Sequence, residues 1–158
     1  MLFIFRPVNE TDARAFFSWR YEAPYDVYNL DPPDEEVVRF FLDSKNAYYS
    51  IIDEHENLVG FCCFGSDAQV PGGDYSINAL DIGIGIRPDL TGQGHGLTYV
   101  NTVLDFAGRT FKPTLLRVTV AEFNKRAVRV WEKAGFRPVQ RFQESQDERD
   151  YVVLKRKA

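Results

Sequence analysis

Cysteine and histidine are scarce in this chain of 158 residues, which has two of each. Cys62 and Cys63 are neighbours inside an apolar run. On a strand, adjacent side chains point to opposite faces, so we expect no disulfide between them and a reducing compartment around them. Together with His55 and His95 they give no spaced set of zinc ligands, so we expect no bound metal.

An excess of positive charge and a long apolar run are also missing. The formal net charge is -4, and the one gathering of basic residues, 125–129, falls on a predicted helix where a solvated face is usual. This argues against a nucleic-acid partner. No apolar run approaches the length of a membrane span, and the first residues show no basic-then-apolar signal segment. We therefore expect a cytoplasmic protein that contacts neither nucleic acid nor membrane.

The composition that remains is that of an ordinary globular protein. Apolar residues make up 44% of the chain and charged residues 27%, and no repeat or linker interrupts it. We expect one domain over residues 1–158. Aromatic residues reach 15%, which indicates a well-filled core, an aromatic-lined substrate cleft, or both.

The apolar periodicity predicts seven strands and four helices. The strands are expected at 2–6, 48–53, 58–64, 77–86, 115–121, 136–142 and 151–155, and the helices at 9–21, 34–42, 95–109 and 124–135. Because helices and strands interleave, the predicted class is α/β, with a single mixed central sheet. The strands 77–86 and 115–121 are joined through a helix, so they should be parallel neighbours. Asp81, Gly83 and Gly85 should share one open face of the first of them.

The most informative stretch is 86–97, where a strand ends and a helix begins. Gly92, Gly94 and Gly96 alternate with other residues there, so several backbone N–H groups should face one space at the positive end of the helix dipole. This favours a phosphate or pyrophosphate site over a tight turn alone. A P-loop would need Lys and then Ser or Thr after its last glycine, and Leu97 stands there instead. The spacing also differs from that of a dinucleotide-binding loop.

At this point the sequence resembles the GNAT family of N-acetyltransferases. That family's coenzyme A loop, R/Q-x-x-G-x-G/A, is similar to Thr91-Gly92-Gln93-Gly94-His95-Gly96, with Thr91 in place of the usual Arg or Gln. Its second signature, an Asn at the start of the last helix, an aromatic near the end and then Gly-Phe, is similar to Asn124, Trp131 and Gly135-Phe136. The opening Arg6-Pro7 and the early Asp12 also look like the family's first strand and helix.

The resemblance implies a GNAT-like fold with acetyl-CoA lying between two splayed parallel strands. It implies coenzyme contacts from Ile86, Leu90, Thr91, Gly92, Gln93, Gly94, His95, Gly96, Asn124 and Trp131. The backbone N–H groups of residues 90–96 would hold the pyrophosphate. Asn124 would contact the coenzyme, cap its helix, or do both. Trp131 stands where many relatives have a Tyr that acts as the general acid, and it would be a packing residue or a wall of the coenzyme slot.

The remaining chemistry needs a base, oxyanion donors and an acceptor pocket. Asp81 is the first candidate for the base and Glu122 the second, with a surface or ion-paired role equally open for each. A backbone N–H among residues 84–87 would polarise the thioester carbonyl. The acceptor amine would be bound by acidic and aromatic residues of the loop between the first two helices, or these residues merely cover the core: Glu22, Tyr25, Asp26 and Tyr28.

The resemblance therefore implies an N-acetyltransferase. It would transfer the acetyl group of acetyl-CoA to a primary amine of a small molecule or of a peptide N-terminus, by direct attack in a ternary complex. An alternative is a non-catalytic module that senses coenzyme A or acetyl-CoA. A nucleotide-binding oxidoreductase is disfavoured by the glycine spacing. The sequence pattern is compatible with a monomer or a homodimer.

Overall fold

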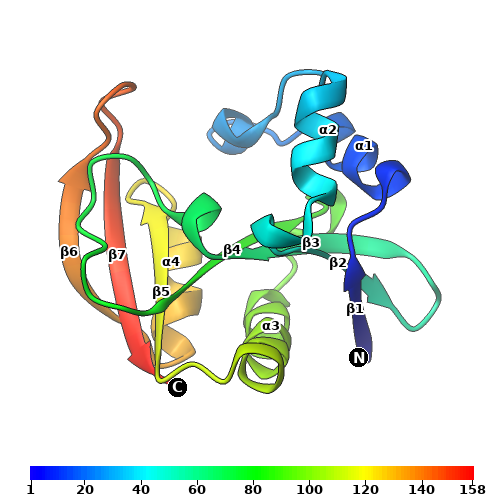
Figure 1. Cartoon of the computed structure of the whole chain (residues 1–158). Helices are drawn as coiled ribbons and strands as arrows, with labels where there is room; N and C mark the ends of the chain where they lie inside the picture. Colours follow the sequence, from blue (N-terminus) through cyan, green and yellow to red (C-terminus); the bar gives the residue numbers. More distant parts are fainter. The chain divides into compact units, whose positions relative to one another are not determined.

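The computed structural model describes all 158 residues as one mixed sheet with four α-helices (Figure 1). Its seven strands lie in the order β1-β2-β3-β4-β5-β7-β6, which confirms the predicted fold class. The strands are β1 (Phe3–Pro7), β2 (Tyr48–Asp53), β3 (Leu58–Phe64), β4 (Leu80–Ile86), β5 (Leu115–Ala121), β6 (Arg137–Gln143) and β7 (Asp150–Lys157). The helices are α1 (Glu10–Ser18), α2 (Glu35–Leu42), α3 (Gly96–Phe111) and α4 (Lys125–Lys133). No helix combines the length and the apolar character that crossing a membrane requires.

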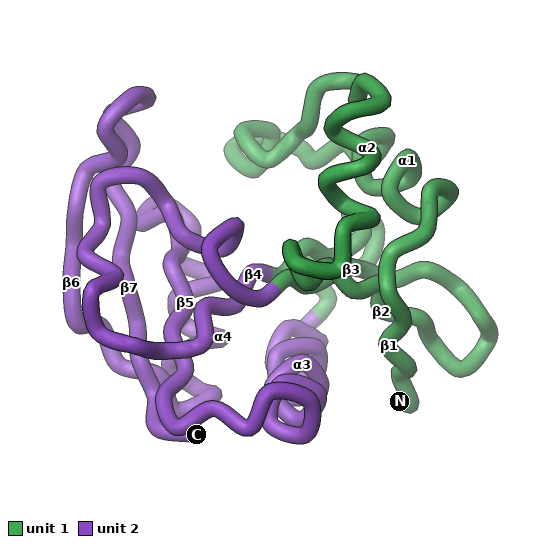
Figure 2. The backbone as a smooth tube through the Cα atoms, viewed as in Figure 1, with its two compact units in different colours: residues 1–63, 84–93 green, residues 64–83, 94–158 purple.

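The chain divides into two compact units, drawn in different colours in Figure 2. The first unit comprises residues 1–63 and 84–93, and the second comprises residues 64–83 and 94–158. The prediction of a single domain over residues 1–158 stays a prediction.

The first unit is held together by an aromatic core. Residues Ala13, Phe16 and Phe17 recur at helical spacing and form the buried face of α1. The ring of Phe16 lies 4.6 Å from that of Phe61 on β3, and Phe41 of α2 lies 4.3 Å from Tyr48 on β2, between ring centroids. Such ring pairs add to the stabilisation from burial itself. Much of the chain's aromatic content is thus used in packing.

The second unit packs two helices on the strands β4, β5, β7 and β6. The buried stripe of α3 includes Val100, Val103, Leu104 and Ala107, and the strands contribute alternate apolar residues of β5 and the run 152–154 of β7. At the end of α4 the Trp131 ring meets Phe136 edge-on, with 5.0 Å between their centroids. Helix α4 then stops because Gly135 takes φ 98°, a conformation that favours glycine.

The parallel pairing of β4 with β5 is confirmed, and it is short. It runs from Leu80 opposite Leu116 to Ile82 opposite Val118. Residues 84–86 of β4 belong to the first unit, where the ring of Phe61 occupies the space that a side chain at position 85 would need. The glycine-bearing face predicted to be open is therefore filled by Phe61 at Gly85.

Two element boundaries differ from the prediction. Helix α1 ends at Ser18 rather than at residue 21, because Trp19 is already extended and the Arg20 guanidinium donates to the carbonyl oxygens of Phe17 and Trp19, at 3.1 and 2.8 Å. Strand β4 begins at Leu80 rather than at residue 77. The carbonyl of Ile77 accepts a hydrogen bond from an arginine side chain instead of a strand partner.

Candidate active site

The segment after β4 begins with a tight turn whose polar groups are used internally. The Arg87 guanidinium donates to the carboxylate of Asp89 at 2.7 and 3.1 Å and to the carbonyl of Leu58 at 2.8 Å. The N–H of Leu90 donates to the carbonyl of Arg87 at 2.9 Å, and both the N–H and the hydroxyl of Thr91 donate to the carbonyl of Pro88. The N–H groups of Leu90 and Thr91 are therefore used within the turn, and the contact of these two residues with the coenzyme stays a prediction.

The backbone N–H groups that follow have no acceptor within the protein. Between Thr91, which closes the turn, and Tyr99, which donates to the carbonyl of His95, no N–H of residues 92–98 makes a hydrogen bond. Gly92 and Gly94 adopt φ of 71° and 83°, which allows the chain to turn twice within three residues. The first part of this continuous loop, through residue 93, belongs to the first unit, and the remainder leads into α3 of the second.

The glycines of the loop have different roles. A side-chain carbon built at Gly94 would meet nothing within 4 Å, so the backbone there is open to a ligand. A carbon built at Gly96 would lie 3.1 Å from Val130, so this glycine allows α4 to approach the beginning of α3. The exposed N–H groups before α3, the positive end of its dipole and the open backbone at Gly94 together form a cradle for an anion.

The other side chains predicted in the loop have local roles. His95 stands at the N-cap of α3 and makes no capping hydrogen bond through its side chain. The Gln93 amide donates to the carbonyl of Asp89 at 2.6 Å. Ile86 contributes its carbonyl, which accepts a hydrogen bond from the hydroxyl of Tyr21.

Asn124 and Trp131 are both explained by the structure of α4. The Asn124 side chain accepts a hydrogen bond from the N–H of Ala127 at 3.1 Å, so it caps the helix, which is one of the two roles expected for it. The other role, a contact with the coenzyme, stays a prediction. The indole of Trp131 is buried against Phe136 in the core of the second unit. Its contact with the coenzyme stays a prediction, and packing is the role that the contacts show.

Asp81, the first candidate for the base, lies in a buried ion pair. Its carboxylate oxygens accept hydrogen bonds from Nε and Nη2 of Arg117 at 2.6 and 2.8 Å, and one accepts a further hydrogen bond from the amide of Gln69 at 2.8 Å. The exposed fractions of the two paired side chains are 4% and 2%. Hydrogen bonding to this carboxylate raises the pKa of Arg117. A carboxylate with three donors and almost no exposure is poorly suited to take a proton from an amine.

Glu122, the second candidate, lies just beyond the end of β5. It is half-buried and pairs with Arg141 at 3.6 Å, while its N–H donates to the carbonyl of Asp150. Its carboxylate is more accessible than that of Asp81, so Glu122 stays a candidate for the base.

Among the backbone N–H groups of residues 84–87, which were proposed to donate to the thioester oxygen, the N–H of Arg87 instead donates to the carbonyl of Val59 at 2.9 Å.

The predicted acceptor-binding residues lie together in the first unit. Tyr25 to Tyr28 form a short 3-10 turn, and the N–H of Tyr25 donates to the carbonyl of Glu22. The side chains of Glu22, Asp26 and Tyr28 are exposed. The structure adds one residue that the sequence reasoning passed over, Tyr21, whose ring meets Tyr28 edge-on at 6.5 Å.

Tyr21 connects the acceptor loop to the end of β4. Its hydroxyl donates to the carbonyl of Ile86 at 2.6 Å, and its N–H donates to the side chain of Asn29 at 2.7 Å. Burial raises the pKa of the Tyr21 phenol to about 12, so it stays protonated at neutral pH. The aromatic-rich loop was the signal that pointed to this region, but a hydrogen bond across 65 positions has no local pattern.

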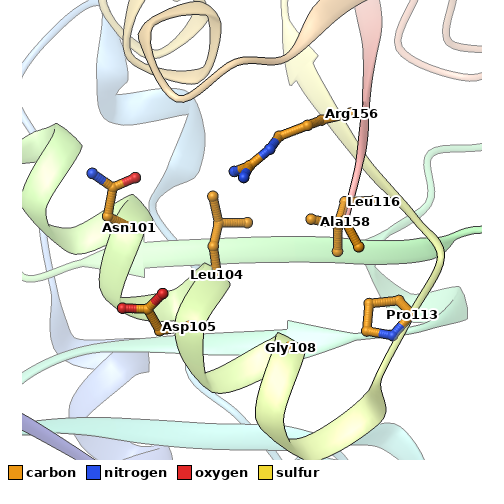
Figure 3. Close-up of a pocket in the computed structure, with 8 residues that line it drawn as sticks. All are labelled: Asn101, Leu104, Asp105, Gly108, Pro113, Leu116, Arg156 and Ala158. Atoms are coloured by element: carbon orange, nitrogen blue, oxygen red, sulfur yellow. The ribbon is translucent and has the colours of Figure 1, made fainter.

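A cavity of about 400 Å³ lies elsewhere in the second unit, and Figure 3 shows its lining. It shares no residue with the predicted site. Its lining residues are Asn101, Leu104, Asp105, Gly108, Pro113, Leu116, Arg156 and Ala158. No group of three or more His, Cys, Asp or Glu side chains in the structure is arranged to hold a metal ion.

The mixed sheet, the short parallel pairing and the glycine cradle before α3 define a coenzyme-binding acyltransferase. The family model described as the Acetyltransferase (GNAT) domain matches residues 3–137, and the chain belongs to this family. It is an acetyl-CoA-dependent N-acetyltransferase that acts on an amine.

The chain is similar to acetyltransferases of Vibrio cholerae. It is 24% identical to a spermidine N(1)-acetyltransferase over 128 residues, which are 81% of this chain and 69% of that protein. A chimera of the Vibrio cholerae spermidine N-acetyltransferase and hSSAT has a TM-score of 0.75 at 20% identity, covering 98% of this chain and 95% of that one. The Vibrio cholerae enzyme in complex with CoA and spermine has a TM-score of 0.68 at the same identity and coverage. At these identities the structural likeness shows the fold.

Proposed function

We propose that this protein acetylates a primary amine of a small polycationic molecule, of the polyamine type, by direct attack on acetyl-CoA in a ternary complex. The observation that carries the proposal is the run of unpartnered N–H groups at residues 92–98 around the open backbone of Gly94. A pyrophosphate is an anion of the size and charge that such a cradle accepts. The backbone cradle does not need the Thr91 side chain, whose hydroxyl closes the preceding turn.

The acceptor class is supported by charge and by the relatives. The loop between α1 and α2 exposes the carboxylates of Glu22 and Asp26 and the ring of Tyr28. Carboxylates and aromatic faces attract ammonium groups. The Vibrio cholerae relatives are named for spermidine, a polycationic amine. A peptide N-terminus carries a single ammonium group, so it makes less use of several carboxylates.

The reaction places few demands on the protein beyond positioning. The neutral amine attacks the thioester carbonyl carbon, so that the N–C bond forms and the C–S bond breaks. The thiolate leaves with the electron pair, and the amine nitrogen loses one proton, so that coenzyme A leaves as the thiol. Trp131 is buried, and its indole N–H does not ionise near neutral pH, so it cannot act as the general acid. In this proposal the solvent protonates the thiolate. Glu122 is the carboxylate that we assign to receive the proton of the amine.

The test combines coenzyme binding with amine turnover. Acetyl-CoA consumption and thiol release are measured against spermidine, spermine, aminoglycosides, amino acids and basic peptides. Calorimetry with acetyl-CoA compares the wild type with Gly94→Trp, which should fill the cradle and weaken binding by about tenfold or more. Gly65→Trp is a matched control, because Gly65 also has a positive φ of 107° and open space around it.

The outcomes separate the two halves of the proposal. Turnover that is highest on polyamines, and that is lost in Gly94→Trp but kept in Gly65→Trp, supports both the acetyl transfer to a polyamine and the pyrophosphate cradle around Gly94. Tight acetyl-CoA binding without thiol release on any amine contradicts the acetyl transfer. Unchanged binding in Gly94→Trp contradicts the assignment of the loop as the pyrophosphate cradle.

A further inference from the structure

The cavity of about 400 Å³ in the second unit is lined by two oppositely charged side chains that do not pair with each other (Figure 3). These are Asp105 of α3 and Arg156 of β7, and neither belongs to any ion pair of the structure. Asn101, one helical turn before Asp105, lines the same cavity, and its side-chain amide makes no hydrogen bond within the protein. The cavity therefore offers a cation, an anion and an amide that the chain itself leaves unused.

The position of Arg156 is set by its surroundings. It stands opposite Leu116 in the antiparallel pairing of β7 with β5, and its Nη1 donates to the carbonyl of Ala134 at 3.1 Å. A side-chain carbon built at Gly135 would lie 3.4 Å from Cδ of Arg156, so this glycine leaves room for the aliphatic part of the side chain. Figure 3 shows the side chain extending from β7 toward α3. A guanidinium has five N–H donors in a planar fork, so donors remain for a ligand.

Gly108 is a second, independent observation at the same cavity. It lies inside α3, where glycine destabilises the helix relative to alanine. Gly108 lines the cavity, and a side-chain carbon built there would meet nothing within 4 Å. No other part of the chain needs the space that this glycine leaves. The wall of the cavity at Gly108 is thus open to a molecule from outside.

We propose that this cavity binds a small zwitterion, an α-amino acid with an aliphatic side chain. Its carboxylate would bind the planar fork of Arg156, and its ammonium group would pair with Asp105. The buried side chains of Leu104 and Leu116 provide an apolar wall for the aliphatic part. The Asn101 amide can donate to the carboxylate or accept from the ammonium group. A polyamine is a poor fit, because it has no carboxylate and Arg156 repels it.

The zwitterion site is separate from the anion cradle that precedes α3. Gly96 begins this helix, and Gly108 lies about 18 Å further along it at a rise of about 1.5 Å per residue. We therefore expect acetyl-CoA and the zwitterion to bind at the same time. The site shares no residue with the predicted acetyl-transfer site, so it does not depend on the proposed function.

The first test uses L-leucine and two analogues that each lack one charge. Calorimetry titrates the full chain with L-leucine, with isocaproate, which lacks the ammonium group, and with isoamylamine, which lacks the carboxylate. L-leucine should bind with a Kd of about 1 mM or lower. Each analogue should bind about tenfold or more weakly, because one charged group of the cavity is then left without its partner.

Variants of the cavity then locate the bound ligand. Arg156→Gln removes the partner of the carboxylate and should weaken the binding of L-leucine by about tenfold or more. The matched control is Arg137→Gln, which changes an exposed arginine of β6 outside the cavity and should leave binding unchanged. Gly108→Leu fills the cavity and favours the helix, so it should abolish binding without lowering Tm. Gly108→Ala adds a single methyl group and should keep most of the binding.

The contrary results are equally specific. No binding of L-leucine at about ten times the expected Kd would overturn the inference. Binding that survives both Arg156→Gln and Gly108→Leu would overturn the assignment to this cavity. Isocaproate that binds as tightly as L-leucine would overturn the zwitterion class, because Asp105 would then take no part. Displacement of L-leucine by acetyl-CoA would place the amino acid in the coenzyme site and would also contradict the inference.

Discussion

The replacement of Asp81 by asparagine separates a structural role from a catalytic one. Asp81→Asn keeps the shape of the side chain and removes the charge that compensates Arg117, whose side chain is 2% exposed. Removing one partner of a buried ion pair costs about 3–5 kcal/mol, because an uncompensated charge stays buried. For a chain of this length, a loss of about 3 kcal/mol lowers Tm by about 6–12 °C. We therefore expect a large loss of stability.

Urea denaturation of the wild type and the variant provides the measurement, with the midpoint compared at constant slope. Adding Arg117→Met to Asp81→Asn should recover roughly half of the loss, because the unpaired charge is then removed as well. A loss below about 1 kcal/mol in Asp81→Asn, or a double variant less stable than the single one, would refute the reasoning. An Asp81→Asn protein that keeps its stability and loses all turnover would restore Asp81 as the catalytic base.

Two further predictions concern the first unit. Burial raises the pKa of Tyr21 from 10.0 to about 12, so its contribution to stability is complete below about pH 10 and is lost as the pH rises to about 12. In Tyr21→Phe the free energy of unfolding should therefore fall less between about pH 10 and pH 12. An absorbance titration of the variant should also lack the phenol that ionises near pH 12. Asp12 accepts hydrogen bonds from Ser50 at 2.7 Å and from Arg6 at 3.1 Å, so Asp12→Ala should cost about 1–3 kcal/mol in urea denaturation and leave acetyl-CoA binding by calorimetry unchanged.

The elements that the sequence predicts well are those whose cause is local. The apolar run Leu58–Phe64 and the β-branched run Leu115–Ala121 predict the observed strand limits. The end of α1 was predicted three residues too late, because apolar spacing continues after Ser18 while the carbonyls there are taken by Arg20. The beginning of β4 was misplaced for a similar reason, since Arg117, which is distant in sequence, binds the carbonyl of Ile77.

In the candidate site, too, the features with a local cause could be predicted and those set by residues distant in sequence could not. The anion cradle could be predicted because glycine affects the backbone directly, and Gly94 needs no partner to leave its N–H groups accessible. The role of Asp81 could not, because a carboxylate on a strand is a base or half of an ion pair depending on what faces it, and Arg117 lies 36 positions away.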